Sequence, residues 1–423
     1  MPQIPINIGY TPMGFNYPNT RPNLVPPAGY NRGQSPMMFG TNGTQKITVS
    51  TFDGPPGSGG FYYTSLCLGL DGLLYSFPFN TGNQMMVLNP SDGSFTLKTG
   101  PFGSSSFRNI IRAQNGDIIG IPAGALQVCA YRPSTDTFTN FGSSTAGTSK
   151  WGQGILAQNG LIYCAPMNNS AILVIDPISR TTRTIGSFGA STNKYITGVL
   201  GPNGLIYFFP LVNERRILIL DPITETTRFG INVSELLTNP NTSIFTYGGS
   251  LGFDNQYYFN LYNGAGYGVF DFSNESIRIV INKGVATAKN RPPFYGAGGS
   301  YVTACGIFLL TPTGKFISGV GDITNTTDID QVLPWEIDPE KETVNRLLES
   351  NLINPLPFLS GIGISGHISG CMDLNGNFWM VGNNSKTILK ISGYDIPTPE
   401  MYTMPQDLSG LPTSLYNKFF NHY

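Results

Sequence analysis

Charged side chains are scarce in this sequence. Lys, Arg, Asp and Glu together make up 12% of the 423 residues, and the formal net charge is -1. A protein that binds nucleic acid usually carries a basic surplus or a basic patch, and this sequence has neither. We therefore expect no nucleic-acid partner.

Long hydrophobic runs are also absent. No apolar stretch approaches the roughly 20 residues that a membrane-spanning helix needs. The sequence begins MPQIPINIGYTPMGFNYP, which contains neither the basic start nor the apolar core of a secretory signal. The sequence predicts neither insertion into a membrane nor signal-directed export.

Side chains that could carry enzymatic chemistry are few. There are two histidines, His367 and His422, and five cysteines without a C-x-x-C pair. Cys67 and Cys371 each lie five residues before a turn glycine, where other repeats have Ile or Val, so we predict that both are core residues. No phosphate-binding loop and no H-E-x-x-H motif occurs. We expect no catalytic residue, no metal and no cofactor.

A repeated hairpin organises the chain. Glycines that end short turns between two apolar runs recur at an interval of 44 residues: Gly72, Gly116, Gly160 and Gly204. Asn-Gly between apolar runs is a strong hairpin signal, because a tight turn needs positive φ. Weaker copies of the turn follow at Asp254-Asn255, at 312–314 and at Asn375-Gly376, which makes seven units.

A second marker accompanies the turns. The end of the third strand in five units is Asn, Arg or Asp followed by Pro, which ends a strand and starts a turn. These pairs are Asn89-Pro90, Arg132-Pro133, Asp176-Pro177, Asp221-Pro222 and Asp338-Pro339. Four short strands per unit and a period near 44 residues predict an all-β fold, a seven-bladed β-propeller with four-stranded antiparallel blades.

The two ends of the chain lack this period. Residues 1–44 contain prolines and aromatic residues but few charges, which predicts an extended N-terminal arm that packs on its own propeller or on a neighbouring subunit; the alternative is a disordered tail. The propeller is expected at 45–393, with 45–52 as the closing strand of the last blade beside Thr387–Ile391. Residues 394–423 form the predicted C-terminal tail. Within 338–352, a capping Asp and apolar residues near helical spacing predict a short helix.

Aligning the units on the turn glycine reveals candidate ligand-binding residues. An aromatic residue or histidine lies nine residues before the glycine and a polar residue seven before it. These are Tyr63, Ser65, Phe107, Asn109, Trp151, Gln153, Tyr195, Thr197, His367 and Ser369. We expect them at the axial mouth, where they form a ring suited to a sugar or another neutral ligand. The alternative is that they pack between blades, with their polar groups bonded to backbone.

The pattern L-x-P-N-G-L-I-Y at 200–207, followed by I-L-I-L-D-P at 217–222, resembles propellers of the NHL-repeat, streptogramin-lyase-like and gluconolactonase-like superfamily. Residues 372–391 carry a further copy. The resemblance implies histidine-bearing catalysis with Mg²⁺ for the lyase-like members and an axial metal held by Asn and carboxylates for the lactonase-like members. The aligned positions here hold one histidine, His367, and no carboxylate, which favours a non-enzymatic protein.

Composition and the arm together predict a function. A neutral all-β chain with an aromatic arm looks like a virion structural or appendage protein that displays a propeller, with a role in host attachment. Its expected partners are other subunits, through 1–44 and 394–423, and a surface glycan or receptor. Its expected location is the virion, or otherwise the cytoplasm. The alternatives are a lyase- or lactonase-like enzyme and a free carbohydrate-binding propeller.

Overall fold

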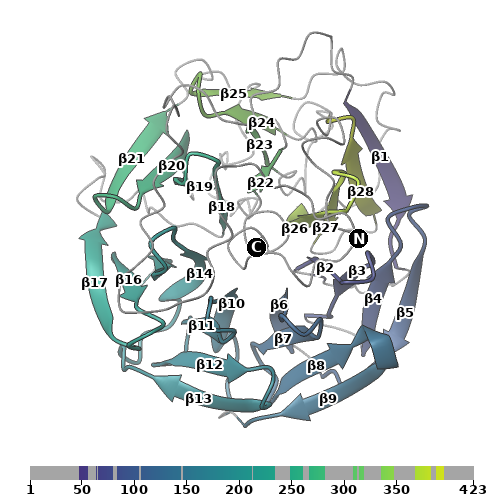
Figure 1. Ribbon diagram of the computed structural model, residues 1–423, viewed down its shortest axis with the longest axis horizontal. Coiled ribbons are helices and arrows are strands. Elements are labelled where there is room, and N and C mark those ends of the chain that lie inside the picture. The colour runs from purple at the N-terminus through teal and green to yellow at the C-terminus, as the bar shows by residue number, and fades with distance from the viewer. Residues whose placement is uncertain are drawn as a thin grey trace, which may run out of the picture.

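The described part of the chain is built from β-strands and contains no α-helix. The structure is a computed structural model, and it describes residues 47–55, 63, 65–79, 83–103, 106–143, 146–211, 213–233, 248–260, 266–281, 308–311, 314–318, 335–346, 367–382 and 387–394. The strands form seven four-stranded antiparallel sheets around a common axis (Figure 1). The predicted seven-bladed propeller is therefore confirmed.

We number the blades 1 to 7 along the chain and describe each from its axial strand outward. Blade 1 contains β2 (Cys67–Leu68), β3 (Leu74–Ser76), β4 (Gln84–Leu88) and β5 (Phe95–Thr99). Blade 2 contains β6 (Phe107–Arg112), β7 (Ile118–Pro122), β8 (Val128–Arg132) and β9 (Thr137–Phe141). Blade 3 contains β10 (Trp151–Leu156), β11 (Ile162–Pro166), β12 (Ile172–Asp176) and β13 (Thr181–Ile185).

The remaining blades follow the same order. Blade 4 contains β14 (Tyr195–Leu200), β15 (Ile206–Pro210), β16 (Arg216–Leu220) and β17 (Thr227–Asn232). Blade 5 contains β18 (Gly249–Leu251), β19 (Tyr257–Asn260), β20 (Gly266–Asp271) and β21 (Ser276–Ile281). Blade 6 contains β22 (Phe308–Leu310), β23 (Phe316–Ser318), β24 (Trp335–Asp338) and β25 (Thr343–Arg346). Blade 7 contains β26 (His367–Met372), β27 (Phe378–Gly382), β28 (Thr387–Ser392) and β1 (Thr48–Asp53).

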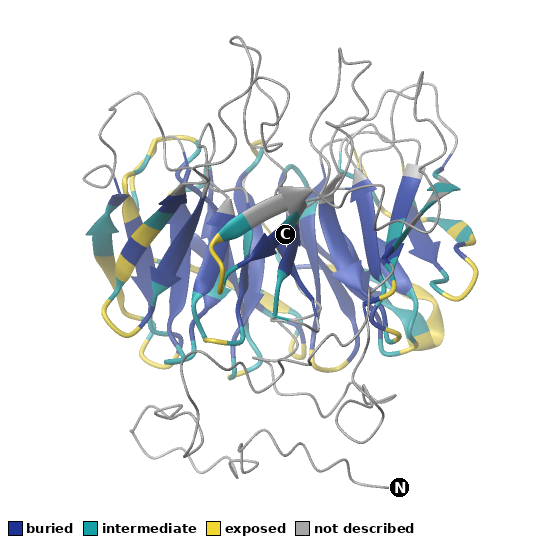
Figure 2. Cartoon of the chain, turned by 90° about the horizontal axis from the view of Figure 1, so that it is seen from above, coloured by how far each residue is buried: buried dark blue, intermediate teal, exposed yellow. Residues whose placement is uncertain are grey.

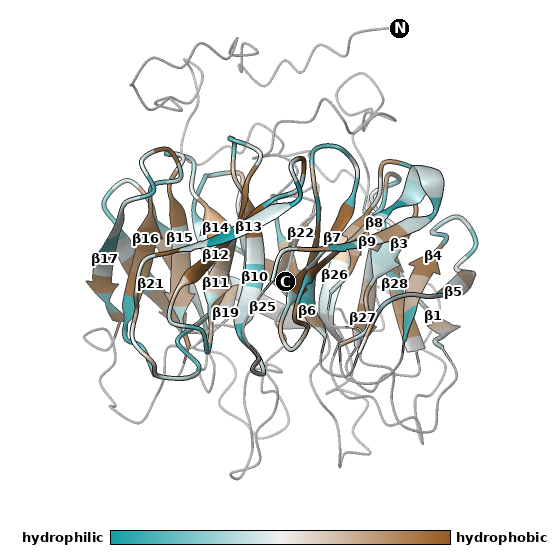
Figure 3. Cartoon of the chain, turned by 90° about the horizontal axis from the view of Figure 1, so that it is seen from below, coloured by the Kyte–Doolittle hydropathy of each residue, from teal (hydrophilic) through white to brown (hydrophobic). Residues whose placement is uncertain are grey.

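The core lies between the blades. The second and third strands are apolar runs that are buried on both faces, as in β11 and β15, because a neighbouring blade covers each side of the sheet (Figure 2). The outer strands consist mainly of exposed and half-buried residues, as in β13. Figure 3, which colours each residue by its hydropathy, shows hydrophobic residues along the strands within the ring. Cys67 and Cys371 are fully buried core residues, as predicted.

The last blade combines both ends of the propeller. β1 pairs with β28 over six residues, from Thr48 opposite Ser392 to Asp53 opposite Thr387. This is the pairing predicted for the closing strand at 45–52. At the junction with blade 1, the Phe52 ring lies over Gly93, where an added Cβ would be 2.2 Å from Phe52 Cε1. Gly93 has φ +77°, so glycine is required there both by conformation and by the close approach of Phe52.

The short helix predicted within 338–352 is wrong over the described residues. Asp338 ends β24, and Thr343–Arg346 forms β25 instead of a helical turn. Asp338 Oδ1 accepts a hydrogen bond from the Lys341 N–H at 3.1 Å, so the Asp-Pro pair starts a β-turn here as it does in the other blades. Residues 347–352 lie outside the described part of the chain. So do the predicted arm at 1–44 and all of the predicted tail except Tyr394.

The up-and-down order gives the ring two distinct faces. Turns between first and second strands and turns between third and fourth strands lie on one face, which we call the hairpin face. Connections between second and third strands and between successive blades lie on the other, the loop face. Asn159 Nδ2 of blade 3 donates to the Pro222 carbonyl of blade 4 at 3.0 Å, which joins the two kinds of turn on the hairpin face.

Ion pairs link the blades along the outer edge of the hairpin face. Each joins a cation on an outer strand to an acid in the next blade, in the turn between its third and fourth strands. The pairs are Lys98 to Asp136, Arg183 to Glu225, Arg228 to Glu275, and Arg278 to Glu342. The four acids have φ between 51° and 54°. Hydrogen bonds from Arg183 and Lys98 lower the pKa of Glu225 and Asp136. These pairs are partly exposed, so solvent screens them and each contributes little to stability.

Candidate functional site

The ring predicted at the axial mouth is largely buried. The described side chains of the ring, which exclude that of His367, are at most 4% exposed. His367 begins β26 and pairs with Gly382, and its side chain is outside the described part. The described ring residues lie at or near the starts of the axial strands and beneath the surface.

The aromatic members point outward into their own blades. Their polar atoms donate to backbone carbonyls near the start of the third strand. Tyr195 Oη donates to the Arg216 carbonyl at 3.1 Å, and Trp151 Nε1 donates to the Ala171 carbonyl at 2.9 Å. Tyr63 Oη donates to the Gln84 carbonyl at 3.3 Å. Burial raises the pKa of Tyr63 and of Tyr195, so both hydroxyls stay protonated.

The polar members join successive blades. Each accepts a hydrogen bond from a backbone N–H of the axial strand in the next blade. The bonds are Leu66 N–H to Ser369 Oγ at 3.1 Å, Ile110 N–H to Ser65 Oγ at 3.0 Å, Gly154 N–H to Asn109 Oδ1 at 3.2 Å, and Gly198 N–H to Gln153 Oε1 at 3.1 Å. An axial strand has an unpaired inner edge, and these four residues, the belt residues, satisfy part of it. The packing alternative accounts for this geometry.

Gln153 is a belt residue whose side-chain oxygen accepts two hydrogen bonds from the next blade. Its Oε1 accepts from the Gly198 N–H and from Thr197 Oγ1 at 2.7 Å. Gln153→Met keeps the length of the side chain but leaves two buried donors without this acceptor, so we expect unfolding to become easier by about 2 kcal/mol. Chemical denaturation measures the change. Thr99→Met, on the exposed outer strand β5, is the matched control, and an equal loss in both variants would contradict a special role for the belt.

Two buried lysines near the ring were not predicted. Lys150 and Lys194 occupy equivalent positions, ten residues before Gly160 and Gly204, and are at most 3% exposed. Lys150 Nζ donates to the Ala125 carbonyl at 2.6 Å, and Lys194 Nζ donates to the Ser191 carbonyl at 2.5 Å. Burial lowers the pKa of both ammonium groups. Their recurrence at one repeat position is the sequence signal that would have identified them.

Arg108 supplies a third cation at this end of the axial strands. It is half-buried, its guanidinium lies 4.8 Å from the Phe79 ring centroid, and its Nη2 donates to Ser149 Oγ at 3.2 Å. The guanidinium thus bridges blades 1, 2 and 3. Together with the two lysines it places three cationic side chains at the loop-face end of blades 2 to 4, where Glu214 is an acid that interacts with Lys194.

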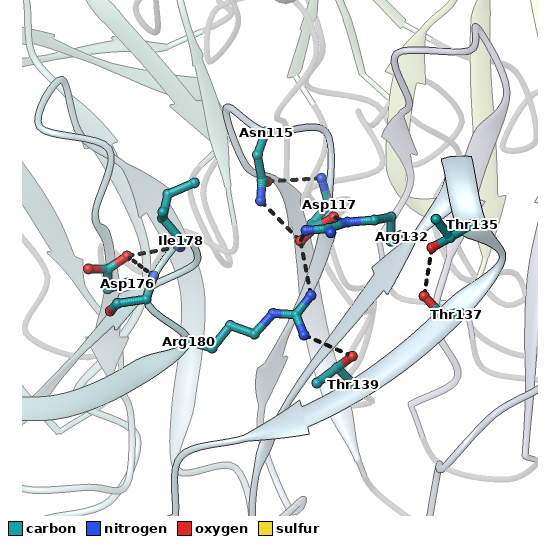
Figure 4. Close-up of polar contacts among 10 residues, drawn as sticks. Asn115, Asp117, Arg132, Thr135, Thr137, Thr139, Asp176, Ile178 and Arg180 are labelled. Atoms are coloured by element: carbon teal, nitrogen blue, oxygen red, sulfur yellow. Dashed lines mark hydrogen bonds and ion pairs between the residues drawn. The ribbon is translucent and has the colours of Figure 1, made fainter.

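A buried carboxylate anchors the opposite, hairpin face. The Asp117 side chain is 1% exposed and forms two hydrogen bonds with Arg132, at 2.7 and 2.8 Å (Figure 4). Arg180 of blade 3 approaches to 4.0 Å, and Asn115 Nδ2 donates to Asp117 Oδ2 at 3.0 Å. Arg180 also donates to Thr139 at 3.1 Å, so this network fastens blade 2 to blade 3. Its bonds are structural, because every oxygen of Asp117 points to a protein donor.

Candidate metal-binding and reactive groups are few within the described ranges. No group of three or more His, Cys, Asp or Glu side chains there is arranged to hold a metal ion. The four described cysteines are free and buried, and burial raises the pKa of Cys129 to about 12. Asp373 accepts from the N–H groups of Asn375 and Asn377, so its carboxylate stabilises the turn before β27. No helix in the same ranges has the length and apolar character of a membrane span.

Comparison with known proteins identifies the fold. No protein-family model matches the sequence, and the curated proteins contain no match. Virginiamycin B lyase from Staphylococcus aureus aligns with a TM-score of 0.58 and 13% identity, over 82% of this chain and 99% of that chain. A catalytically inactive histidine-to-alanine form of that lyase, with quinupristin, gives 0.59 and 11%, over 82% and 99%.

A second kind of neighbour is not described as an enzyme. The extracellular domain of a hybrid two-component system from B. thetaiotaomicron aligns with a TM-score of 0.56 and 13% identity, over 83% of this chain and 43% of that chain. At these identities the likeness concerns the fold alone. The chain is therefore a seven-bladed propeller similar to the streptogramin lyases in architecture.

Proposed function

We propose that this protein is a non-enzymatic recognition and assembly protein that displays its propeller from a larger structure. The observation that carries the proposal is where the propeller's two ends lie. Thr48 of β1 is opposite Ser392 of β28, so both the arm and the tail join the ring on the hairpin face. The hairpin face then points toward the assembly, and the loop face points outward.

The axial belt supports a scaffold role. The belt residues are used in hydrogen bonds that join successive blades, and Tyr63, Trp151 and Tyr195 are used in hydrogen bonds within their own blades. A ring fixed in this way presents the loops between its blades on a rigid frame, which is how recognition surfaces are commonly built. The half-buried Arg108 offers a cationic group at that end of the frame, which favours an acidic or polyhydroxylated surface.

The nature of the assembly follows from composition. A neutral chain rich in Gly and Pro, with an aromatic segment at 1–44, suits a virion component, and host attachment through a surface glycan or receptor is the corresponding role of the loop face. The arm and the tail at 394–423 then bind neighbouring subunits. Prolines lower the entropy lost when such a segment docks, and tyrosines add contact area.

Removing the arm tests the assembly role. We expect the full chain to associate at micromolar concentration in light scattering coupled to gel filtration, and the deletion of 1–44 to be a monomer. Because the deletion keeps β1, its melting temperature should equal that of the full chain within about 2 °C. If the full chain and the deletion variant are both monomers, or if both form the same oligomer, the assembly role is wrong. Binding to a glycan array separates glycan recognition from assembly alone.

The lyase alternative rests on the fold and is tested separately. Quinupristin with Mg²⁺ is the probe, because an inactive virginiamycin B lyase has been determined with quinupristin. We expect mass spectrometry to find the compound unchanged after prolonged incubation with the full chain. Turnover that is lost in His367→Ala would replace the proposed function with catalysis.

A further inference from the structure

Two large apolar side chains are exposed at equivalent positions on the hairpin face. Ile178 is 68% exposed and Ile223 is 67% exposed. Each follows the Asp-Pro pair that begins the turn between third and fourth strands, in blades 3 and 4. Figure 1 shows these two blades side by side. Single exposed apolar residues are common, but a matched pair on adjacent turns is a candidate contact surface.

The other blades show that these turns do not need isoleucine. The equivalent position holds Ser91, Ser134, Ser273 and Glu340 in blades 1, 2, 5 and 6. The local geometry is shared: the N–H at this position donates to the preceding Asx side chain in Ile178, Ile223, Ser91 and Ser273, at 2.8 to 3.1 Å. Turn formation and core packing therefore leave the isoleucines unexplained.

The arm joins the propeller on this same face. β1 begins at Thr48 on the hairpin face of blade 7, and 46 residues precede the first described one. An extended segment of that length spans up to about 150 Å, which exceeds the width of a propeller. Residues 1–44 of this segment contain Tyr, Phe, Ile and Met and carry only Arg21 and Arg32 as charged side chains, so they can pack against exposed isoleucines.

We propose that Ile178 and Ile223 form the docking site for the arm, residues 1–44, of a second copy of this chain. This inference rests on the proposed function and names the surface through which the copies bind. Each copy has both an arm and an isoleucine pair, so two copies with opposed hairpin faces make the same contact twice. A closed two-fold pair of this kind needs no further surface.

The position of blade 7 favours a second copy over the chain's own arm. Blades 3 and 4 lie across the ring from blade 7 (Figure 1). An arm docking on its own copy must cross the whole hairpin face. In a two-fold pair, blade 7 of one copy can lie over blades 3 and 4 of the other, so that the arm reaches the isoleucines directly.

The double variant Ile178→Ser, Ile223→Ser tests the site with residues that the sister turns already contain. We expect dissociation of the full-chain dimer to occur at a concentration higher by about tenfold or more, measured by light scattering over a dilution series. The melting temperature should not change. Leu126→Ser is the matched control, because Leu126 is 58% exposed on the loop face, and it should dissociate like the unmodified chain.

The outcomes separate this site from the proposed function. If the double variant dissociates like the unmodified chain while deletion of 1–44 gives a monomer, the assembly role stands and the docking site is wrong. If the full chain and the deletion are both monomers, the proposed assembly itself fails. Hydrogen exchange identifies the copy involved: we expect protection of the arm to fall on dilution. Protection that is unchanged by dilution would show docking on the same copy and overturn the inference.

Discussion

Deleting residues 1–52 is expected to destabilise the propeller by about 5 kcal/mol or more, whereas deleting 1–40 leaves its stability unchanged. The longer deletion removes most of β1, which pairs with β28 over six residues. It also removes Ile47, which is 5% exposed, and Phe52, whose ring centroid lies 5.3 Å from that of Trp379. Burial of two such side chains stabilises by about 1.5 to 3 kcal/mol each.

Loss of β1 has a second consequence. It exposes the edge of β28 and uncovers Gly93, so the junction between blades 7 and 1 loses its outer contact. Thermal unfolding of both deletions measures the effect, with an expected fall on the order of 10 °C for the longer one. If both deletions melt alike, β1 does not close the ring energetically.

Asp117→Ala is expected to cost about 3 kcal/mol of unfolding free energy. The substitution removes a carboxylate that is 1% exposed and receives two hydrogen bonds from Arg132. Breaking a buried ion pair on one side typically costs about 3 to 5 kcal/mol. The lower value applies here, because Arg132 and Arg180 are 40% and 34% exposed and can be rehydrated.

An exposed pair provides the control for this measurement. Arg183→Ala removes the partner of Glu225 at a junction where the side chains are 48% and 28% exposed, and should cost less than about 1 kcal/mol. Denaturant unfolding of both variants gives the comparison. Similar losses would mean that Asp117 is no more important than the pairs along the outer edge.

Some elements could be predicted because their cause is local. The turn at Gly204 needs positive φ and has +80°, and the Asp-Pro pair at 221–222 ends a strand wherever it occurs. The same rule explains the wrong helix within 338–352. Its capping Asp and apolar spacing describe a turn followed by a strand equally well, and only pairing of β25 with β24 decides between them.

The repeat places the ring residues on the axial strands, but the environment of their side chains could not be predicted from the sequence. Alternation places Asn109 and Gln153 on one face of a strand, yet whether that face meets solvent or the next blade depends on how blades stack. The neighbouring backbone N–H groups, at Gly154 and Gly198, lie 45 residues away in the chain. The sequence of a single repeat does not reveal such contacts between blades.

By itself, the sequence determined the blade count, the strands and the closing partner of the last blade, because turn chemistry and apolar runs repeat with a fixed period. The tertiary structure decided which polar side chains form hydrogen bonds inside the protein and are therefore not available to a ligand. It buried Lys194 and Asp117, brought the ring residues into the junctions, and left Ile178 and Ile223 in solvent. The physical reason is that burial in a propeller is a property of the junction between two blades, and no repeat contains both sides of it.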